Sequence, residues 1–302
     1  MKISILILAF TASALSQPII KSSTVLPLPE EVQWFAPRFS PDGAAIYVTT
    51  SGYNGIWKYD IAAQSLQELT RDPGAGYEFA ISADGNMIAF RRTFVHENGL
   101  ERTQEIVRLD LAAGEEHVIV SAPTLSPPTL CGEEIVYRVG GSVAGQNKVE
   151  SNAPILLGIE KTKIVLLENG AKKIVDPISN GSYIWPVLSP DRNSLAAFET
   201  LKGLFISDVD GKNVRLLGRY NAPAWTHDGE WVVTMSDKDD GHEIISSDLV
   251  AVRVEGGEVI QLTSTDGIIE LYPHCSPVDN RIVCATANGR VLLLTYSVEN
   301  EK

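Results

Sequence analysis

The residues most able to hold a metal ion lie in one acidic segment. Asp237, Asp239 and Asp240 belong to the run Asp-Lys-Asp-Asp-Gly-His-Glu that ends at residue 243. Carboxylates at alternate positions can bind Ca²⁺ through their hard oxygen atoms. The spacing is not that of an EF-hand, because Gly241 stands where a ligand is expected. Two interpretations follow, a calcium site at the three aspartates and a solvated acidic loop, and we expect no other cofactor.

Residue patterns typical of catalysis are not visible. The chain has no Gly-x-Ser-x-Gly elbow, no phosphate-binding glycine loop and no Ser/His/Asp order above background. Cys131, Cys275 and Cys284 lack the spacing of a zinc site. Cys275 and Cys284 flank a short turn, so we expect buried free thiols there, with a disulfide as the alternative. We assign no catalytic residue and leave enzymatic activity open.

Composition excludes several classes of protein. The chain has 302 residues, 38 acidic against 25 basic side chains and a formal net charge of −13. Such a charge disfavours binding to a phosphate backbone, so no nucleic-acid partner is expected. Hydrophobic residues make up 44% of the chain, enough for a large buried core.

The first 16 residues have the layout of a secretory signal peptide. Lys2 is followed by the apolar run 3–10 and by a segment rich in alanine and serine that ends at Ser16. The apolar run is too short to span a bilayer. We therefore expect an exported protein, periplasmic or extracellular, that begins near residue 17, is soluble and is peripheral to the membrane at most.

One turn recurs along the chain. Ser40-Pro41-Asp42-Gly43 has the residues of a type I turn and is followed by an alternating strand. Related turns begin at positions 82, 126, 189, 226 and 276, and the copies at 126 and 276 are degraded. Proline stands three residues before the Ser/Thr in five of the six copies. Because proline cannot donate to a ladder, we place it at an edge or at a strand start.

A second hairpin follows each of the first five copies, through turns such as Asn169-Gly170 and Asp210-Gly211. Four antiparallel strands per 40 to 60 residues are typical of propeller blades. We predict an all-β, six-bladed β-propeller as one domain over 17–302. The expected blades are 33–71, 76–120, 121–177, 182–218, 219–264 and 268–300, and an N-terminal strand in 18–29 completes the last blade and closes the ring.

These repeats resemble a known family. The lead-in Pro37 to Gly43, the Asp-Gly turns and the closing Gln261-Leu262-Thr263 are similar to the WD-like repeat of TolB-type β-propellers. The resemblance implies a propeller fold. It covers the chain from about Val32 onward but leaves no room for the N-terminal α/β domain of TolB, so partner-binding roles cannot be carried over.

The candidate binding face is the end of the propeller that carries the loops between the second and third strands and between blades. The long loops 94–103, 140–152 and 236–247 belong to it. Aromatic side chains at a concave mouth suit peptide anchoring or sugar stacking, and packing between blades is the alternative. The candidate residues, all near the starts of inner strands, are Trp34, Tyr77, Glu78, Trp185, Tyr220, Tyr272 and His274.

The stand-alone propeller and the signal peptide favour a non-catalytic module. We expect it to bind a protein or peptide of the bacterial cell envelope and to be monomeric by itself. The alternative is a glycan-binding protein or a metal-assisted, polysaccharide-acting enzyme that uses the central funnel, with His274, Glu78 and the 237–243 loop as candidates.

Overall fold

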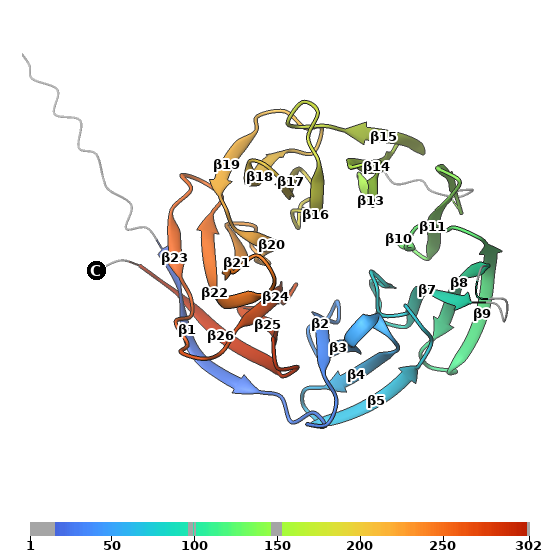
Figure 1. Cartoon of the computed structure of the whole chain (residues 1–302), viewed down its shortest axis with the longest axis horizontal. Helices are drawn as coiled ribbons and strands as arrows, with labels where there is room; N and C mark the ends of the chain where they lie inside the picture. The colour runs from blue at the N-terminus through green and yellow to red at the C-terminus, as the bar shows by residue number, and fades with distance from the viewer. Residues whose placement is uncertain (1–15, 96–98, 100, 146–152, 301–302) are drawn as a thin grey trace, which may run out of the picture.

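The computed structural model describes residues 16–95, 99, 101–145 and 153–300. These residues form seven antiparallel sheets arranged around a common centre (Figure 1). Five sheets have four strands and two have three. We call the sheets blades 1 to 7 in chain order and name the strands of each blade A to D from the centre outward. Strands β2, β10, β13, β16, β20 and β24 lie nearest the centre in Figure 1.

The first three blades contain eleven strands and one short helix. Blade 1 comprises β2 (Trp34–Phe39), β3 (Ala45–Thr50), β4 (Ile56–Asp60) and β5 (Ser65–Thr70), with the 3-10 helix η1 (Ser51–Tyr53) between β3 and β4. Blade 2 comprises β6 (Ala80–Ile81), β7 (Met87–Val95), β8 (Arg102–Asp110) and β9 (Glu115–Ala122). Blade 3 comprises β10 (Thr129–Cys131), β11 (Glu134–Val139) and β12 (Ser142–Ala144).

The other four blades complete the ring. Blade 4 comprises β13 (Ile155–Glu160), β14 (Lys163–Glu168) and β15 (Ala171–Val175). Blade 5 comprises β16 (Tyr183–Leu188), β17 (Ser194–Glu199), β18 (Gly203–Asp208) and β19 (Arg215–Gly218). Blade 6 comprises β20 (Asn221–Trp225), β21 (Trp231–Asp239), β22 (Ile244–Arg253) and β23 (Val259–Gln261). Blade 7 comprises β24 (Glu270–Cys275), β25 (Arg281–Thr286), β26 (Val291–Asn300) and β1 (Ser16–Val25).

The prediction of six blades was wrong. The segment 121–177, expected to be one blade, folds as two three-stranded sheets, blades 3 and 4. The strand at Ile164, assigned to the second hairpin of one blade, is the second strand of blade 4 and pairs with β13. The turn between β13 and β14 is formed by Lys161 and Thr162, which both have a left-handed backbone. It contains none of the Ser-Pro-Asp-Gly residues that marked the other blades, and the sequence pattern therefore missed this hairpin.

The recurring turn owes its stability to a side-chain clamp. In blade 1 the Ser40 hydroxyl lies 2.5 Å from Asp42 Oδ1 and accepts a hydrogen bond of 2.8 Å from the Ala45 N–H. Gly43 closes the turn with a φ of 70°, a left-handed conformation that glycine adopts freely. The same Ser/Thr–Asp pair, again at 2.5 Å, recurs at Ser82–Asp84, Ser189–Asp191 and Thr226–Asp228.

The inner strands contain a bulge where proline was placed at an edge or strand start. The pairing of β2 with β3 skips from Phe35 to Arg38, and Ala36 has a φ of 43°. Strands β16, β20 and β24 show the same shift around Pro186, Pro223 and Pro273. A bulge leaves residues outside the ladder, so the missing N–H of proline costs no strand hydrogen bond there.

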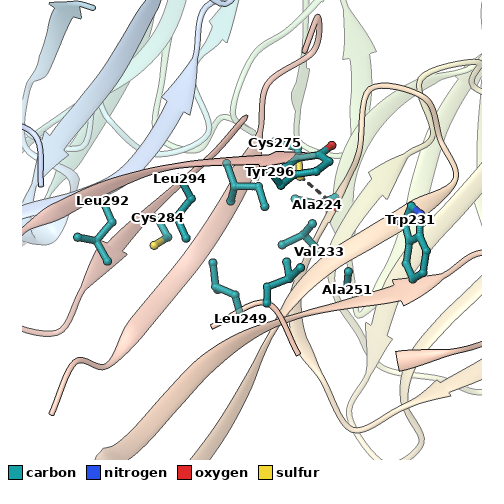
Figure 2. Close-up of a cluster of buried hydrophobic side chains, with 12 residues drawn as sticks. Ala224, Trp231, Val233, Leu249, Ala251, Cys275, Cys284, Leu292, Leu294 and Tyr296 are labelled. Carbon is teal, nitrogen blue, oxygen red and sulfur yellow. Dashed lines mark hydrogen bonds between the residues drawn. The ribbon is translucent and has the colours of Figure 1, made fainter. Parts of the chain in front are cut away.

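Apolar side chains fill the space between neighbouring blades. Figure 2 shows this packing between blades 6 and 7, where Trp231, Val233 and Leu249 belong to the same buried cluster as Leu292 and Leu294. Cys275 and Cys284 are buried and free, and the Cys275 thiol lies 3.7 Å from the Ala224 carbonyl oxygen. Burial raises the pKa of both thiols far above the ordinary range, so they stay protonated as part of the core.

The two ends of the chain close the ring. Strand β1 pairs antiparallel with β26 from Ser16↔Asn300 to Val25↔Leu292, so the N-terminal segment supplies the outer strand of blade 7. The Arg253 guanidinium of blade 6 also donates to the Ser16 carbonyl oxygen at 3.3 Å. The predicted signal peptide, residues 1–16, lies outside the described residues except for Ser16. Within the described part of the chain, no helix has the length and apolar character needed to cross a membrane.

We predict that Thr226→Val destabilises the protein by about 1–3 kcal/mol. The Thr226 hydroxyl is buried, contacts Asp228 and accepts a hydrogen bond from the Trp231 N–H at 3.1 Å, and valine leaves both groups without this partner. Urea unfolding measures the loss. Glu230→Ala, at an exposed position in the same turn, is the matched control, and an equal loss in both variants would contradict the clamp.

We predict that Glu270→Gln stabilises the protein more at pH 8 than at pH 4. Glu270 is buried, its carboxylate contacts the Thr263 and Thr265 hydroxyls, and burial raises its pKa. A raised carboxyl pKa gives stability that is present below the unfolded-state pKa and is lost as pH rises. Glutamine keeps the hydrogen bonds and carries no charge. Unfolding curves at both pH values measure the difference, which should vanish if Glu270 ionises freely.

Candidate functional site

Five aromatic side chains form a continuous cluster at one end of the ring. The ring centroids are 6.4 Å apart for Trp185 and Tyr272, 5.1 Å for Tyr272 and Phe35, 5.3 Å for Phe35 and Tyr53, and 5.0 Å for Tyr53 and Tyr77. All four contacts are edge-to-face, which suits the quadrupoles of the rings. The chain of rings runs from blade 5 through blades 7 and 1 to the connection before blade 2. We name these five residues the aromatic cluster.

Backbone geometry positions the rings. Trp185 and Tyr272 occupy the inner-strand bulge with φ values of 52° and 53°, a region that bulky residues rarely adopt. Tyr53 has a φ of 59° at the end of η1. Gly76, just before Tyr77, lies so close to blade 1 that a Cβ atom would come within 2.0 Å of Thr49 Oγ1. The same left-handed φ recurs at Ala36 and Ala222 in the other bulges, so this backbone geometry belongs to the repeat.

Exposed apolar side chains share the end that carries the aromatic cluster. In an antiparallel blade, the B–C loop and the connection to the next blade lie at the same end, and this end includes η1 with Tyr53. Trp185 is 36% exposed and Leu201, in the B–C loop of blade 5, is 79% exposed. The others at this end are Phe94, Val95, Ile184, Ile245 and Ile268. Among the described turns at the opposite end, Val278 is exposed in the A–B turn of blade 7.

Two arginines lie beside the aromatic cluster. The Arg91 guanidinium stacks over Tyr77, 5.6 Å from the ring centroid, and donates to the Leu125 carbonyl oxygen at 2.7 Å. Arg38 donates to the Phe79 carbonyl oxygen at 3.1 Å and stacks over the Phe79 ring. Burial lowers the pKa of both arginines, and the charge of Glu78 opposes this effect in each case.

The structure brings some of the sequence-predicted residues together and separates others. Tyr77, Trp185 and Tyr272 belong to the aromatic cluster, and the exposed Glu78 follows Tyr77 with a φ of 49°. Tyr220 packs against the core between blades 5 and 6. Whether any of them binds a ligand stays a prediction.

Trp34 lies away from the aromatic cluster. It is 3% exposed, donates to the Pro29 carbonyl oxygen at 3.0 Å and contacts Trp57 edge-on. These two tryptophans help to line a shallow cavity of about 430 Å³ beside the segment that follows β1. Trp34 thus holds the closing segment against blade 1.

His274 lies inside the ring, two residues after Tyr272. Its Nδ1 accepts a hydrogen bond of 3.3 Å from the Phe39 N–H of the neighbouring inner strand. Burial and the nearby Arg38 charge lower the pKa of His274 to about 3, so the imidazole is neutral at physiological pH. The protein around His274 is thus arranged to keep it uncharged.

The aspartates predicted to bind calcium are engaged in local hydrogen bonds. Asp237 accepts a hydrogen bond of 2.6 Å from the Asn221 side chain, and Asp239 accepts one from the Gly241 N–H. Asp240 accepts two, from the N–H groups of His242 and Glu243. Nowhere in the described residues do three His, Cys, Asp or Glu side chains gather in a way that could hold a metal ion.

Sequence reasoning missed Phe35, Tyr53, Arg38 and Arg91. Phe35 stands next to the singled-out Trp34, and Tyr53 is an aromatic residue in a loop of the predicted binding face, so both had a sequence signal. The two arginines had none, because their contacts at Phe79 and Leu125 are made with the following blade. Of the long loops 94–103 and 140–152, several residues lie outside the described part of the chain.

Comparison with known proteins shows the fold alone. No protein-family model matches the chain, and no curated protein does. TolB from Acinetobacter baumannii is 18% identical with a TM-score of 0.53, over 78% of this chain and 56% of that one. The Cps50 (Swd1) β-propeller domain of Myceliophteria thermophila and the RRP9 WD40 repeats are each 10% identical over 93% of this chain and all of theirs, with TM-scores of 0.61 and 0.63. The chain is therefore similar to TolB and WD40 β-propellers, a fold shared by proteins of many functions.

Proposed function

We propose that this protein is an exported, TolB-like, non-catalytic module that binds a protein or peptide of the bacterial cell envelope at the end of the ring that carries the aromatic cluster. The observation that supports this most strongly is the continuity of the five aromatic rings across blades 5, 7 and 1 with exposed apolar side chains around them. The proposed module acts as a monomer.

Three properties favour a protein partner. Aromatic anchors dominate the energy of protein interfaces, and Trp185 and Tyr272 have the size and exposure of such anchors. Bulges and edge contacts hold the rings in place before binding, which lowers the entropy lost on association. The apolar side chains at this end include Leu201 and Ile245, whose exposed fractions of 79% and 55% exceed the 36% of Trp185.

Export is the second part of the proposal. It is supported by the apolar run 3–10 and the alanine- and serine-rich segment that precedes β1. Strand β1 begins at Ser16, so processing near residue 16 leaves the closing strand within the mature chain. The envelope location of the partner follows from export.

A glycan ligand is the alternative, because aromatic rings also stack on sugars. The Asp237, Asp239, Asp240 calcium site belongs to this alternative. The glycan alternative predicts saturable binding of a saccharide by the purified protein, and its calcium site predicts a melting temperature that changes with EDTA or added Ca²⁺. A protein partner predicts neither effect.

We predict that the double variant Trp185→Ala, Tyr272→Ala weakens partner binding by about 30-fold or more, because truncation of interface anchors typically costs about 2 kcal/mol or more. Titration calorimetry with the captured partner measures the change. Val278→Ala, at the opposite end of the ring, is the control and should leave the affinity unchanged. Loss of affinity in the control alone would contradict the assignment.

Photo-crosslinking in living cells locates the face. A photoreactive residue at Leu201, 79% exposed, should capture one dominant envelope protein, whereas the same residue at Val278, 51% exposed, should not. Capture should disappear in the Trp185→Ala, Tyr272→Ala background. Equal capture from both positions, or none from Leu201 when the protein is exported and folded, would count against the proposal.

A further inference from the structure

Charged side chains are rare on the seven inner strands. Across the described inner strands they are Arg38 of β2, Glu160 of β13 and Glu270 of β24. Two of these charges are compensated or suppressed. Glu160 forms ion pairs with Arg138 and Lys172, and Glu270 has a raised pKa and contacts two threonine hydroxyls.

Arg38 differs from three other enclosed arginines. Arg92, Arg138 and Arg281 each form an ion pair with a carboxylate at 2.7–2.9 Å. Among the described residues, Arg38 has no such partner, and neither has Arg91, whose Nη1 donates to the Leu125 carbonyl oxygen. Its Nη1 donates to the Phe79 carbonyl oxygen, and Glu78 acts on it only as a nearby charge. A guanidinium carries five N–H donors, so most of the donor capacity of Arg38 is left for another acceptor.

His274 adds a second donor beside Arg38. Both residues directly follow the bulge proline, Pro37 in β2 and Pro273 in β24, and these strands lie next to each other in the ring. Because His274 is neutral and its Nδ1 accepts the Phe39 N–H, its ring proton must lie on Nε2. The neighbouring inner wall therefore presents a fixed cation and a neutral N–H donor.

We propose that Arg38 and His274 form a binding site for a carboxylate group, carried by the peptide that docks at the aromatic cluster. This inference rests on the proposed function. Arginine binds a carboxylate through two parallel N–H···O hydrogen bonds, and the neutral imidazole N–H can donate a further hydrogen bond to a carboxylate oxygen. Arg38 lies three residues after Phe35 of the aromatic cluster and donates to the carbonyl oxygen of Phe79, two residues after Tyr77, so the site lies next to the cluster.

The physical reason for such a site is the cost of a desolvated charge. Arg38 is only partly exposed to water, and burial lowers its pKa, so its charge has lost part of its solvation. An incoming carboxylate would restore the lost solvation in surroundings where charge–charge attraction is strong. Among the acidic side chains, Glu78 is close enough for its charge to act on Arg38, whereas exposed charges farther than about 8–10 Å away are screened by salt, so the net charge of −13 does not prevent this.

The site can be tested with sodium acetate as the probe, without the peptide. Acetate should shift the His274 ring signals in ¹H–¹⁵N spectra of the imidazoles in a saturable way, at constant ionic strength. His227, whose Nε2 lies 2.9 Å from the Asn280 side-chain oxygen in the A–B turns, is the internal control and should not move. No shift, an equal shift with sodium chloride, or tighter binding of inorganic phosphate than of acetate would overturn the carboxylate assignment.

Variants and short peptides sharpen the result. Arg38→Gln should abolish the acetate response, and Arg38→Lys should weaken it by about tenfold or more, because lysine cannot bind bidentately. If Arg38→Gln does not fold, the wild-type titrations still decide. Three peptides then distinguish a C-terminal from a side-chain carboxylate: N-acetyl-Ala-Ala, N-acetyl-Ala-Asp-amide and N-acetyl-Ala-Ala-amide. The last has no carboxylate, and a response to it equal to the response to the other two would contradict the site.

These outcomes are separate from the failure of the proposed function. If acetate binds but no protein is captured through Leu201, the anion site stands and the partner proposal fails. If a protein is captured and acetate has no effect, the carboxylate site is overturned and the aromatic cluster binds its partner without it.

Discussion

Crowding at the centre of the ring is the constraint on which the rest of this structure depends. Seven inner strands converge there, and four of them meet the constraint with a bulge that contains proline. The bulge turns Trp185 and Tyr272 out of the regular ladder and lets their rings meet across blade 6. The same bulge places Arg38 and His274 on the wall just beyond it. The bulges therefore shape both the inner wall of the ring and the candidate site.

The ring stays continuous although only three strands of blade 3 and three of blade 4 lie among the described residues. Arginine side chains link successive blades in this half of the molecule. Arg91 of blade 2 binds the Leu125 carbonyl oxygen before blade 3, and Arg138 of blade 3 binds the Leu157 and Ile159 carbonyl oxygens of blade 4. The Leu125, Leu157 and Ile159 carbonyl groups thus receive charged donors.

Local signals in the sequence predicted the elements whose stability is local. The recurring turn at 40–43, which the Ser40–Asp42 contact stabilises, predicted the hairpins. The last blade lacked an outer strand in the sequence, and this predicted where β1 would lie. The blade count failed at Lys161 and Thr162, because this turn has two left-handed residues but none of the Asn, Asp or Gly residues that usually mark such a turn. The aromatic cluster was predicted in part, through Tyr77, Trp185 and Tyr272. Arg38 was not, because its contact with Phe79 links residues 41 positions apart in the chain.

We propose that ligands bind at the end of the ring that carries the aromatic cluster. Hydrogen–deuterium exchange of the purified protein, with and without a partner captured by crosslinking, tests this most directly because every described strand reports at once. We predict slower exchange at the starts of β16 and β24 and around η1, with no change in the turns at Ser40 and Ser276. Protection confined to those turns, or to the outer strands β9 and β19, would contradict it.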